Sequence, residues 1–226
     1  MSGGPVDERV HWFPPAAGLS VPLWRFARAV LEPTTPWLVG FRVAGRRRMP
    51  RSGGVLVVAN HVGDIDPLFV GLACVPRPAQ YMALSMHFTS RPVARLLFQL
   101  GAFPIRVGEA DVRAMRYARE QLAVGRVVVM FPEGSPSWGG PMGEFHEGMG
   151  NLGLTPGTAV VPMAVWGTHR ILRERRVVGR GPVFVAVGEP LAAAATGSRR
   201  QRAADLTARA RASVAALLDP IARAHP

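Results

Sequence analysis

From residue 46 onward, short apolar runs alternate with longer segments whose apolar residues recur every three or four positions. Runs such as VLVVA and VVVM, bounded by glycine or polar residues, are typical of buried strands. Longer segments such as ADVRAMRYAREQLAVG have the spacing of an amphipathic helix and end near a glycine. Strands that alternate with helices predict an α/β sandwich around a mixed, largely parallel sheet.

The predicted elements follow one another without an internal repeat. We expect strands at 53–60, 79–84, 102–106, 126–131, 157–167 and 181–191. We expect helices after Asp66-Pro67 and at 91–101, 110–125 and 198–219.

Residues 1–45 have a different pattern. Residues 1–18 are rich in proline and glycine, and 19–45 contain two short apolar segments broken by Glu32-Pro33 and Pro36. Aromatic side chains alternate with arginines there, which suits an element that inserts among anionic lipid headgroups. A helical hairpin packed on the protein's own core is an equally good interpretation. We therefore predict a loose N-terminus with a short helical, membrane-associating element at 1–45 and a catalytic domain at 46–226.

The charge balance indicates anionic partners. The sequence has 27 basic and 15 acidic residues, for a formal net charge of +12, and every basic residue is arginine. Nucleic acid, an anionic membrane surface or a phosphorylated substrate would each suit that charge. Because no nucleic-acid motif occurs and the arginines form no aromatic-interleaved stripe, we expect no nucleic-acid partner.

The cysteine count and the apolar runs bear on where in the cell the protein is expected. Cys74 is the single cysteine, so no intrachain disulfide can form, and a reducing compartment is expected. The first residues lack the pattern of a secretory signal, and no apolar run reaches the roughly 20 residues of a spanning helix. The protein is therefore expected to be soluble or to lie on a membrane.

Polar residues follow three of the predicted strands at the point where each ends. Asn60-His61, Arg106 and Glu133-Gly134 occupy these positions. In open α/β sheets, ligands bind outside the carboxyl ends of the strands. The three positions therefore mark the expected active site.

His61 and Asp66 have the spacing of a general base and its orienting partner. Asp66 precedes Pro67, which predicts Asp66 as the N-cap of the next helix, with its carboxylate facing back to His61. Such a contact fixes the imidazole tautomer and strengthens the other ring nitrogen as a base. An ordinary capping aspartate is the alternative for Asp66. A metal at Asp64 and Asp66, as in a glycosyltransferase, is a weaker one.

Four blocks, NHVGDIDP, GAFPIR, FPEGS and VVPMAVWG, occur in an order and spacing that resemble the glycerolipid acyltransferase family. Its best-known members are the 1-acylglycerol-3-phosphate acyltransferases, and the resemblance runs from about residue 40 to residue 190. It implies that His61 is the general base, that Asp66 orients it and that Arg106 binds the acceptor's phosphate.

The resemblance also implies the remaining site residues. Glu133 and Gly134 would help to bind the glycerol phosphate, and Pro162 would lie in a segment associated with the acyl chain. Asn60 is counted with them as a substrate-binding residue. From the residues alone, Pro162 could instead mark an edge strand or a bulge.

The implied reaction is acyl transfer from acyl-CoA or acyl-carrier protein to a lysophospholipid hydroxyl, giving phosphatidic acid, without a metal or organic cofactor. The implied location is the cytoplasmic face of the plasma membrane, as a peripheral or monotopic protein. Pro136 and His146 stand where relatives often carry basic residues. A different lysolipid or glycolipid acceptor is therefore an alternative, as is a non-catalytic lipid-binding relative.

Overall fold

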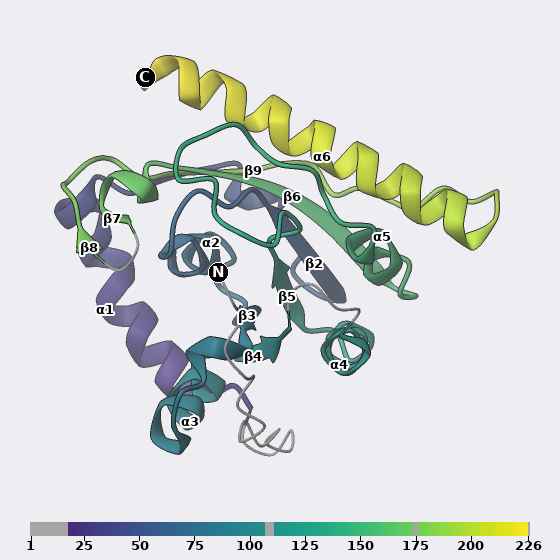
Figure 1. Ribbon diagram of the computed structural model, residues 1–226, viewed down its shortest axis with the longest axis horizontal. Coiled ribbons are helices and arrows are strands. Elements are labelled where there is room, and N and C mark those ends of the chain that lie inside the picture. Colours follow the sequence, from purple (N-terminus) through teal and green to yellow (C-terminus); the bar gives the residue numbers. More distant parts are fainter. Residues whose placement is uncertain (1–17, 107–110, 174–175, 226) are drawn as a thin grey trace, which may run out of the picture.

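The computed structural model describes residues 18–106, 111–173 and 176–225 (Figure 1). The strands of its main sheet are β1 (Arg42–Ala44), β2 (Gly54–Ala59), β3 (Ala79–Leu84), β4 (Ala102–Ile105), β5 (Val127–Met130), β6 (Thr158–Trp166) and β9 (Phe184–Val187). A separate two-stranded hairpin consists of β7 (Leu172–Arg173) and β8 (Arg176–Val177). The helices are α1 (Val21–Val39), α2 (Asp66–Ala73), α3 (Arg91–Gln99), α4 (Val112–Ala123), α5 (Gly148–Gly153) and α6 (Arg199–Ala224).

The sheet has the order β1-β9-β6-β2-β5-β3-β4. Strands β6, β2, β5, β3 and β4 are mutually parallel, whereas β9 pairs antiparallel with β6 and carries β1 parallel to itself. The predicted mixed, largely parallel sheet is confirmed. Strands β2 and β5 are buried along their whole length, as expected for the centre of a parallel sheet covered on both faces.

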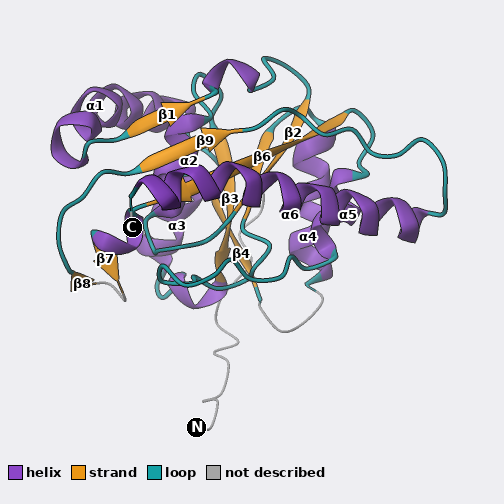
Figure 2. Ribbon diagram, turned by 90° about the horizontal axis from the view of Figure 1, so that it is seen from above, coloured by secondary structure: helices purple, strands orange, loops and turns teal. Residues whose placement is uncertain are grey.

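Two hydrophobic layers lie on opposite faces of the sheet (Figures 1 and 2). One layer packs α2 against alternate residues of β2, β5, β6 and β9, including Val57, Val129 and Met163. The other packs α4, α5 and α6 against the opposite side chains, such as Leu56 and Val128. Successive side chains of each strand point to opposite faces of the sheet, so each strand contributes to both layers.

The predicted strands and helices of residues 46–226 are present, and the structure also contains short elements that have no strong sequence pattern. The structure adds β1, α5, β7 and β8, which the sequence pattern did not predict. Helix α6 extends past the predicted end at residue 219, with Pro220 inside it. Its start is fixed by a capping box in which the Ser198 hydroxyl and the Gln201 side chain bind each other's backbone N–H groups.

The expected break in the N-terminal segment is wrong, because α1 is a single helix that contains both Pro33 and Pro36. The Thr34 hydroxyl donates to the carbonyl of Val30 at 2.7 Å and that of Thr35 to Leu31 at 2.8 Å, so neither reaches the carbonyls of residues 29 and 32 that the two prolines leave without an N–H. No described helix is both long and apolar enough to cross a bilayer.

The predicted boundary at residue 45 also needs correction. Strand β1 lies before that boundary and pairs with β9, with Arg42 opposite Phe184 and Ala44 opposite Ala186. Leu31 and Val39 of α1 pack on the core, as in the alternative interpretation, but as parts of one helix rather than of a helical hairpin. Residues 1–17 of the predicted loose N-terminus lie outside the described residues.

The crossing of α5 and α6 yields a test of the fold. A Cβ on Gly150 would lie 2.1 Å from the backbone oxygen of Ala203. Alanine is the better helix former by about 1 kcal/mol, but overpacking against backbone costs about 1–3 kcal/mol. Gly150→Ala should therefore lower the melting temperature in calorimetry.

Gly181→Ala is the matched control, since its added methyl would meet only the Cβ of Arg170 at 3.9 Å. A Gly150→Ala protein that melts at or above the temperature of the Gly181→Ala protein would contradict the tight crossing.

Candidate active site

The site lies where the adjacent strands β6, β2 and β5 end. His61 follows β2, Glu133 follows β5 and Thr168 follows β6. Since β2 pairs in parallel with both neighbours, the three carboxyl ends meet at one edge of the sheet. The predicted clustering of polar residues at strand ends is therefore present for His61 and Glu133.

The His61 imidazole and the Asp66 carboxylate form the pair expected from their spacing. Nδ1 of His61 lies 2.7 Å from Oδ2 of Asp66, and the side chains are 17% and 0% exposed. The other ring nitrogen, Nε2, has no partner among the described residues. A carboxylate on Nδ1 holds the tautomer in which Nε2 can accept a proton.

Asp66 is held differently from the prediction. Helix α2 has Ile65 as its N-cap, without a side-chain cap, and Asp66 is its first residue. Oδ2 of Asp66 accepts the backbone N–H groups of Val62 at 2.6 Å and Gly63 at 2.9 Å, which precede the helix. Oδ1 accepts a hydrogen bond from the hydroxyl of Thr168. The carboxylate therefore organises the loop that carries His61 rather than capping the helix that follows.

The His61 ring has a second restraint. It stacks on Phe131, with 4.5 Å between ring centroids and an interplanar angle of 27°. Phe131 follows β5 directly, so the neighbouring strand end supplies an apolar wall for the imidazole. Asp66 and Phe131 together restrict the ring to one orientation.

Glu133 binds the backbone of the site. Its Oε1 accepts the N–H of His61 at 2.7 Å, and its Oε2 accepts the N–H of Gly143 at 2.7 Å. Burial raises the pKa of Glu133, and these two hydrogen bonds oppose the rise. The carboxylate thus ties the loop of His61 to the loop after β5. These contacts give Glu133 a positioning role, and its expected role in substrate binding stays a prediction.

The second loop is tied in turn to α6. The Arg211 guanidinium donates to the carbonyl of Gly143 at 3.1 Å and pairs with Glu144 at 3.0 Å. Gly143 therefore connects Arg211 on one side with Glu133 on the other. Helix α6 thereby helps to place a loop at the site.

Gly134 is required by backbone geometry. Its φ is +76°, and its N–H closes a turn on the carbonyl of Phe131 at 3.1 Å. The ring of His146 lies over it, with Nε2 3.3 Å from where a Cβ would be. His146, which stands where relatives often carry a basic residue, is therefore close to Glu133 and Gly134.

Asn60 and Pro162 are both buried. The Asn60 side chain is buried, and its amide bonds both the carbonyl and the N–H of Val165 in β6, at 2.9 and 2.8 Å. It therefore joins the ends of β2 and β6, with both polar atoms of its amide bound to β6. Pro162 is buried within β6, and its ring would meet a Cβ on Gly188 at 2.8 Å. Since β6 is an interior strand, the edge-strand alternative is wrong.

Arg106 lies apart from the other predicted residues. It is exposed and follows β4, the last strand of the sheet. Strands β5 and β3 separate β4 from β2, so the two strand ends are about 14 Å apart at the usual spacing. The structure does not bring Arg106 into contact with His61 or Glu133.

No group of three histidine, cysteine or carboxylate side chains converges on a metal-sized position in the described ranges. Cys74 is buried, and burial raises the pKa of its thiol to about 12, as expected for a core cysteine.

Comparison with known proteins points to one group of enzymes. The model of the family described as Acyltransferase matches residues 40–166, more than half of the chain. The 1-acyl-sn-glycerol-3-phosphate acyltransferase of Borreliella burgdorferi is 26% identical over 156 residues, which are 64% of this chain and 59% of that protein. The enzyme of the same name from Bacillus subtilis is 22% identical over 170 residues, 75% of this chain and 82% of that protein.

The fold has a solved counterpart. The crystal structure of the 1-acyl-sn-glycerophosphate acyltransferase PlsC from Thermotoga maritima aligns with a TM-score of 0.63 at 25% identity. The alignment covers 82% of this chain and 77% of that one. By contrast, the match spans less than two thirds of the Borreliella relative.

The contacts of Glu133 lead to a kinetic prediction. In Glu133→Gln one carboxylate oxygen becomes an NH₂ group, which cannot accept an N–H, so one loop loses its tether. Hydrogen bonds to a charged group are worth about 1.5–3 kcal/mol, so kcat should fall about 10- to 100-fold. Steady-state kinetics should show little change in the acceptor KM.

Glu189→Gln is the control, because that exposed carboxylate pairs with Arg48 and not with a loop of the site. A raised acceptor KM with unchanged kcat in Glu133→Gln would instead support the predicted substrate-binding role.

Proposed function

This chain belongs to the acyltransferase family, since that family's model matches residues 40–166, and we propose that it acts on 1-acylglycerol-3-phosphate. The reaction is transfer of a fatty acyl group from a thioester to the free hydroxyl of that lysophospholipid. The product is phosphatidic acid, an intermediate of phospholipid biosynthesis. The supporting observation is the buried Asp66 carboxylate 2.7 Å from Nδ1 of His61, with Nε2 left for a substrate.

The chemistry takes one displacement. Nε2 of His61 accepts the proton of the acceptor hydroxyl while the oxygen attacks the thioester carbonyl carbon. The tetrahedral intermediate collapses, the C–S bond breaks and the thiolate takes the proton back from His61. The products are an ester and a free thiol, and no metal or organic cofactor takes part.

The oxyanion of that intermediate needs hydrogen-bond donors. The N–H groups of Val62 and Gly63 are already bound to Asp66. The N–H of His61 is bound to Glu133 and that of Ser137 to the carbonyl of His61. These four N–H groups already have acceptors within the protein. The donors to the oxyanion must therefore be other groups.

The acyl donor is acyl-CoA or acyl-carrier protein, since both present the same thioester. The loop after β5, with Pro136 and His146, contains no arginine that could meet the terminal phosphate of an acceptor. Arg106, about 14 Å from the end of β2, does not supply one at close range. A lysolipid or glycolipid without a terminal phosphate is therefore the second candidate acceptor.

The location we propose is an anionic membrane surface, at the cytoplasmic face of the plasma membrane. The outer side of α1 exposes a group of large apolar residues: Val21, Phe26, Val30, Trp37 and Leu38. Trp37 is 92% exposed and Phe26 69%. Exposed aromatic groups beside arginines suit the boundary between headgroups and acyl chains.

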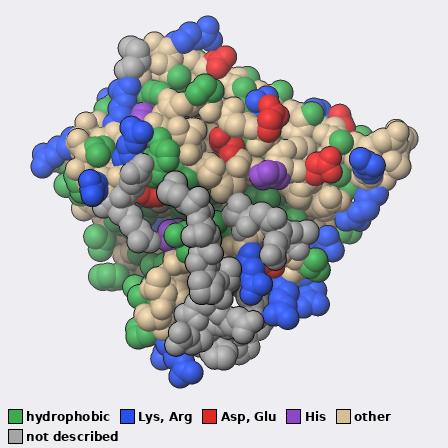
Figure 3. Space-filling view, in the orientation of Figure 1, with side chains coloured by type: hydrophobic (Ala, Val, Ile, Leu, Met, Phe, Trp, Pro, Cys, Tyr) green, Lys and Arg blue, Asp and Glu red, His purple; other side chains and the backbone are tan. Residues whose placement is uncertain are grey.

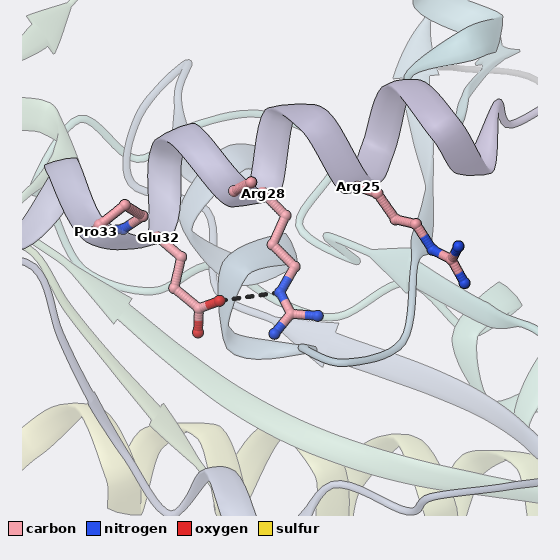
Figure 4. A pocket seen from close by; sticks show the side chains of 5 residues that line it. Arg25, Arg28, Glu32 and Pro33 are labelled. Atoms are coloured by element: carbon pink, nitrogen blue, oxygen red, sulfur yellow. Dashed lines mark hydrogen bonds and ion pairs between the residues drawn. The ribbon is translucent and has the colours of Figure 1, made fainter.

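The arginines of α1 lie on the other side of the helix from Phe26, Val30 and Trp37. Arg25 and Arg28 extend from α1 towards a pocket of about 500 Å³ that contains none of the predicted site residues (Figure 4). Arg28 and Arg46 both bind Glu32, at 2.9 and 2.8 Å, so one carboxylate joins α1 to the domain. On the face shown in Figure 3 the arginines are spread along the rim and form no single stripe, a distribution that suits a broad anionic surface.

His61→Ala tests the reaction. Release of free thiol from long-chain acyl-CoA, measured with a thiol reagent and lysophosphatidic acid, should fall about 10²- to 10⁴-fold, because general-base catalysis is lost. His225→Ala, which removes a ring that stacks on Phe184, should keep the wild-type rate.

A panel of acceptors completes that assay. Turnover only with a phosphate-free lysolipid or a glycolipid would support the proposed acyl transfer but contradict the proposed acceptor. A folded protein without turnover on any acceptor, with either thioester donor, would contradict the enzyme and favour a lipid-binding relative.

Phe26→Ser with Trp37→Ser tests the membrane surface. Each side chain contributes about 1.5–3 kcal/mol when buried in an apolar phase, so sedimentation with phosphatidylglycerol vesicles should weaken roughly tenfold or more. The control is Val112→Ser with Val124→Ser, two valines of the α4 region that are 71% and 68% exposed. An equal loss of vesicle binding in both double variants would contradict the proposal that α1 is the membrane-binding element.

A further inference from the structure

Thr168 supplies the fourth hydrogen-bond donor to the buried Asp66 carboxylate. It follows β6 in a short 3-10 turn (Thr168–Arg170) and is completely buried. Its hydroxyl donates to Oδ1 of Asp66, across 102 residues of sequence. None of the sequence motifs pointed to this residue.

The two oxygens of Asp66 are held unequally. Oδ2 receives three donors, from His61, Val62 and Gly63, all within five residues of Asp66. Oδ1 receives the Thr168 hydroxyl, its one donor in the described ranges. A carboxylate anchored at one oxygen can still turn about its Cβ–Cγ bond. The second anchor fixes the plane of the carboxylate and hence the direction of the bond to His61.

Backbone geometry brings Thr168 to this position. Gly167 has a φ of +95°, and a Cβ there would lie 2.1 Å from the carbonyl oxygen of Pro182. A Cβ on Gly63 would lie 3.1 Å from Oγ1 of Thr168 and 3.0 Å from the N–H nitrogen of His169. Two glycines therefore let the turn after β6 approach the loop of His61.

We propose that Thr168 is a positioning residue of the base: its hydroxyl orients Asp66 and shares the negative charge of the carboxylate. The inference rests on the proposed function, in which His61 with Asp66 removes the acceptor proton. Removing this donor would leave more charge on the carboxylate, so His61 would hold its proton more tightly. The neutral, active form of the ring would then exist only at higher pH.

Other charged groups act on the same pair. Glu133 and His169 both interact electrostatically with Asp66, and Asp64 lies in the same turn. Burial lowers the pKa of His169, and the neighbouring Arg170 lowers it further. Thr168→Val keeps all of these groups and nearly the same side-chain shape, so its effect reports the hydroxyl itself.

The kinetic experiment compares Thr168→Val, Thr168→Ser and wild type with thioester donor and the best acceptor. Thr168→Val should lower kcat about tenfold with KM unchanged, and should move the acid limb of the pH–rate profile to higher pH. Thr168→Ser, which retains the hydroxyl, should recover most of the rate and the wild-type profile. A Thr168→Val enzyme with a lower melting temperature but wild-type kcat and pH profile would overturn the inference and leave Thr168 as a loop tether.

A second measurement does not depend on turnover. The ring signal of His61, identified by its absence in His61→Ala, is followed by NMR through a pH titration of the folded protein. The midpoint should lie at higher pH in Thr168→Val than in wild type. An unchanged midpoint would reject the coupling between Thr168 and His61. If the midpoint moves but wild type turns over no substrate, the proposed function fails and the coupling stands.

Discussion

A carboxylate without exposed surface is the constraint on which the site depends. Asp66 is removed from water, and a buried charge is tolerated only where donors replace its hydration. His61, Val62 and Gly63 supply donors from one loop, and Thr168 supplies another from the next strand. The need to satisfy this one charge therefore decides how the loops after β2 and β6 run.

The same logic extends to β5. Glu133 accepts one N–H from each of two loops, and Phe131 places an aromatic wall against the His61 ring. The parallel order β6-β2-β5 makes this possible, because it sets three strand ends side by side. The blocks that carry His61, Glu133 and Val165, far apart in the sequence, thus become neighbouring parts of one hydrogen-bonded assembly, whereas the block of Arg106 lies apart.

The sequence predicted this site in part, for physical reasons. Strong apolar runs gave the strands, and spacing gave the pair His61 and Asp66. Asn60 and Glu133 were predicted to bind substrate. The structure adds that both side chains bind backbone groups, which a sequence does not show. Thr168 was missed because one hydroxyl after a strand has no pattern. The break in α1 was wrongly predicted, since packing of Leu31 and Val39 on the core outweighs the local cost of the two prolines.

The long reach of the hydrogen bond from Thr168 has a consequence for how activity arises during folding. His61 meets Asp66 across five residues, but Glu133 lies 72 residues and Thr168 102 residues from their partners. The base is complete only once β2 has paired with both β5 and β6, the slow, high-separation contacts of a parallel sheet. A partly folded chain would therefore carry the pair without its supports. The geometry of the pair is thus a property of the complete sheet rather than of the loop that carries His61.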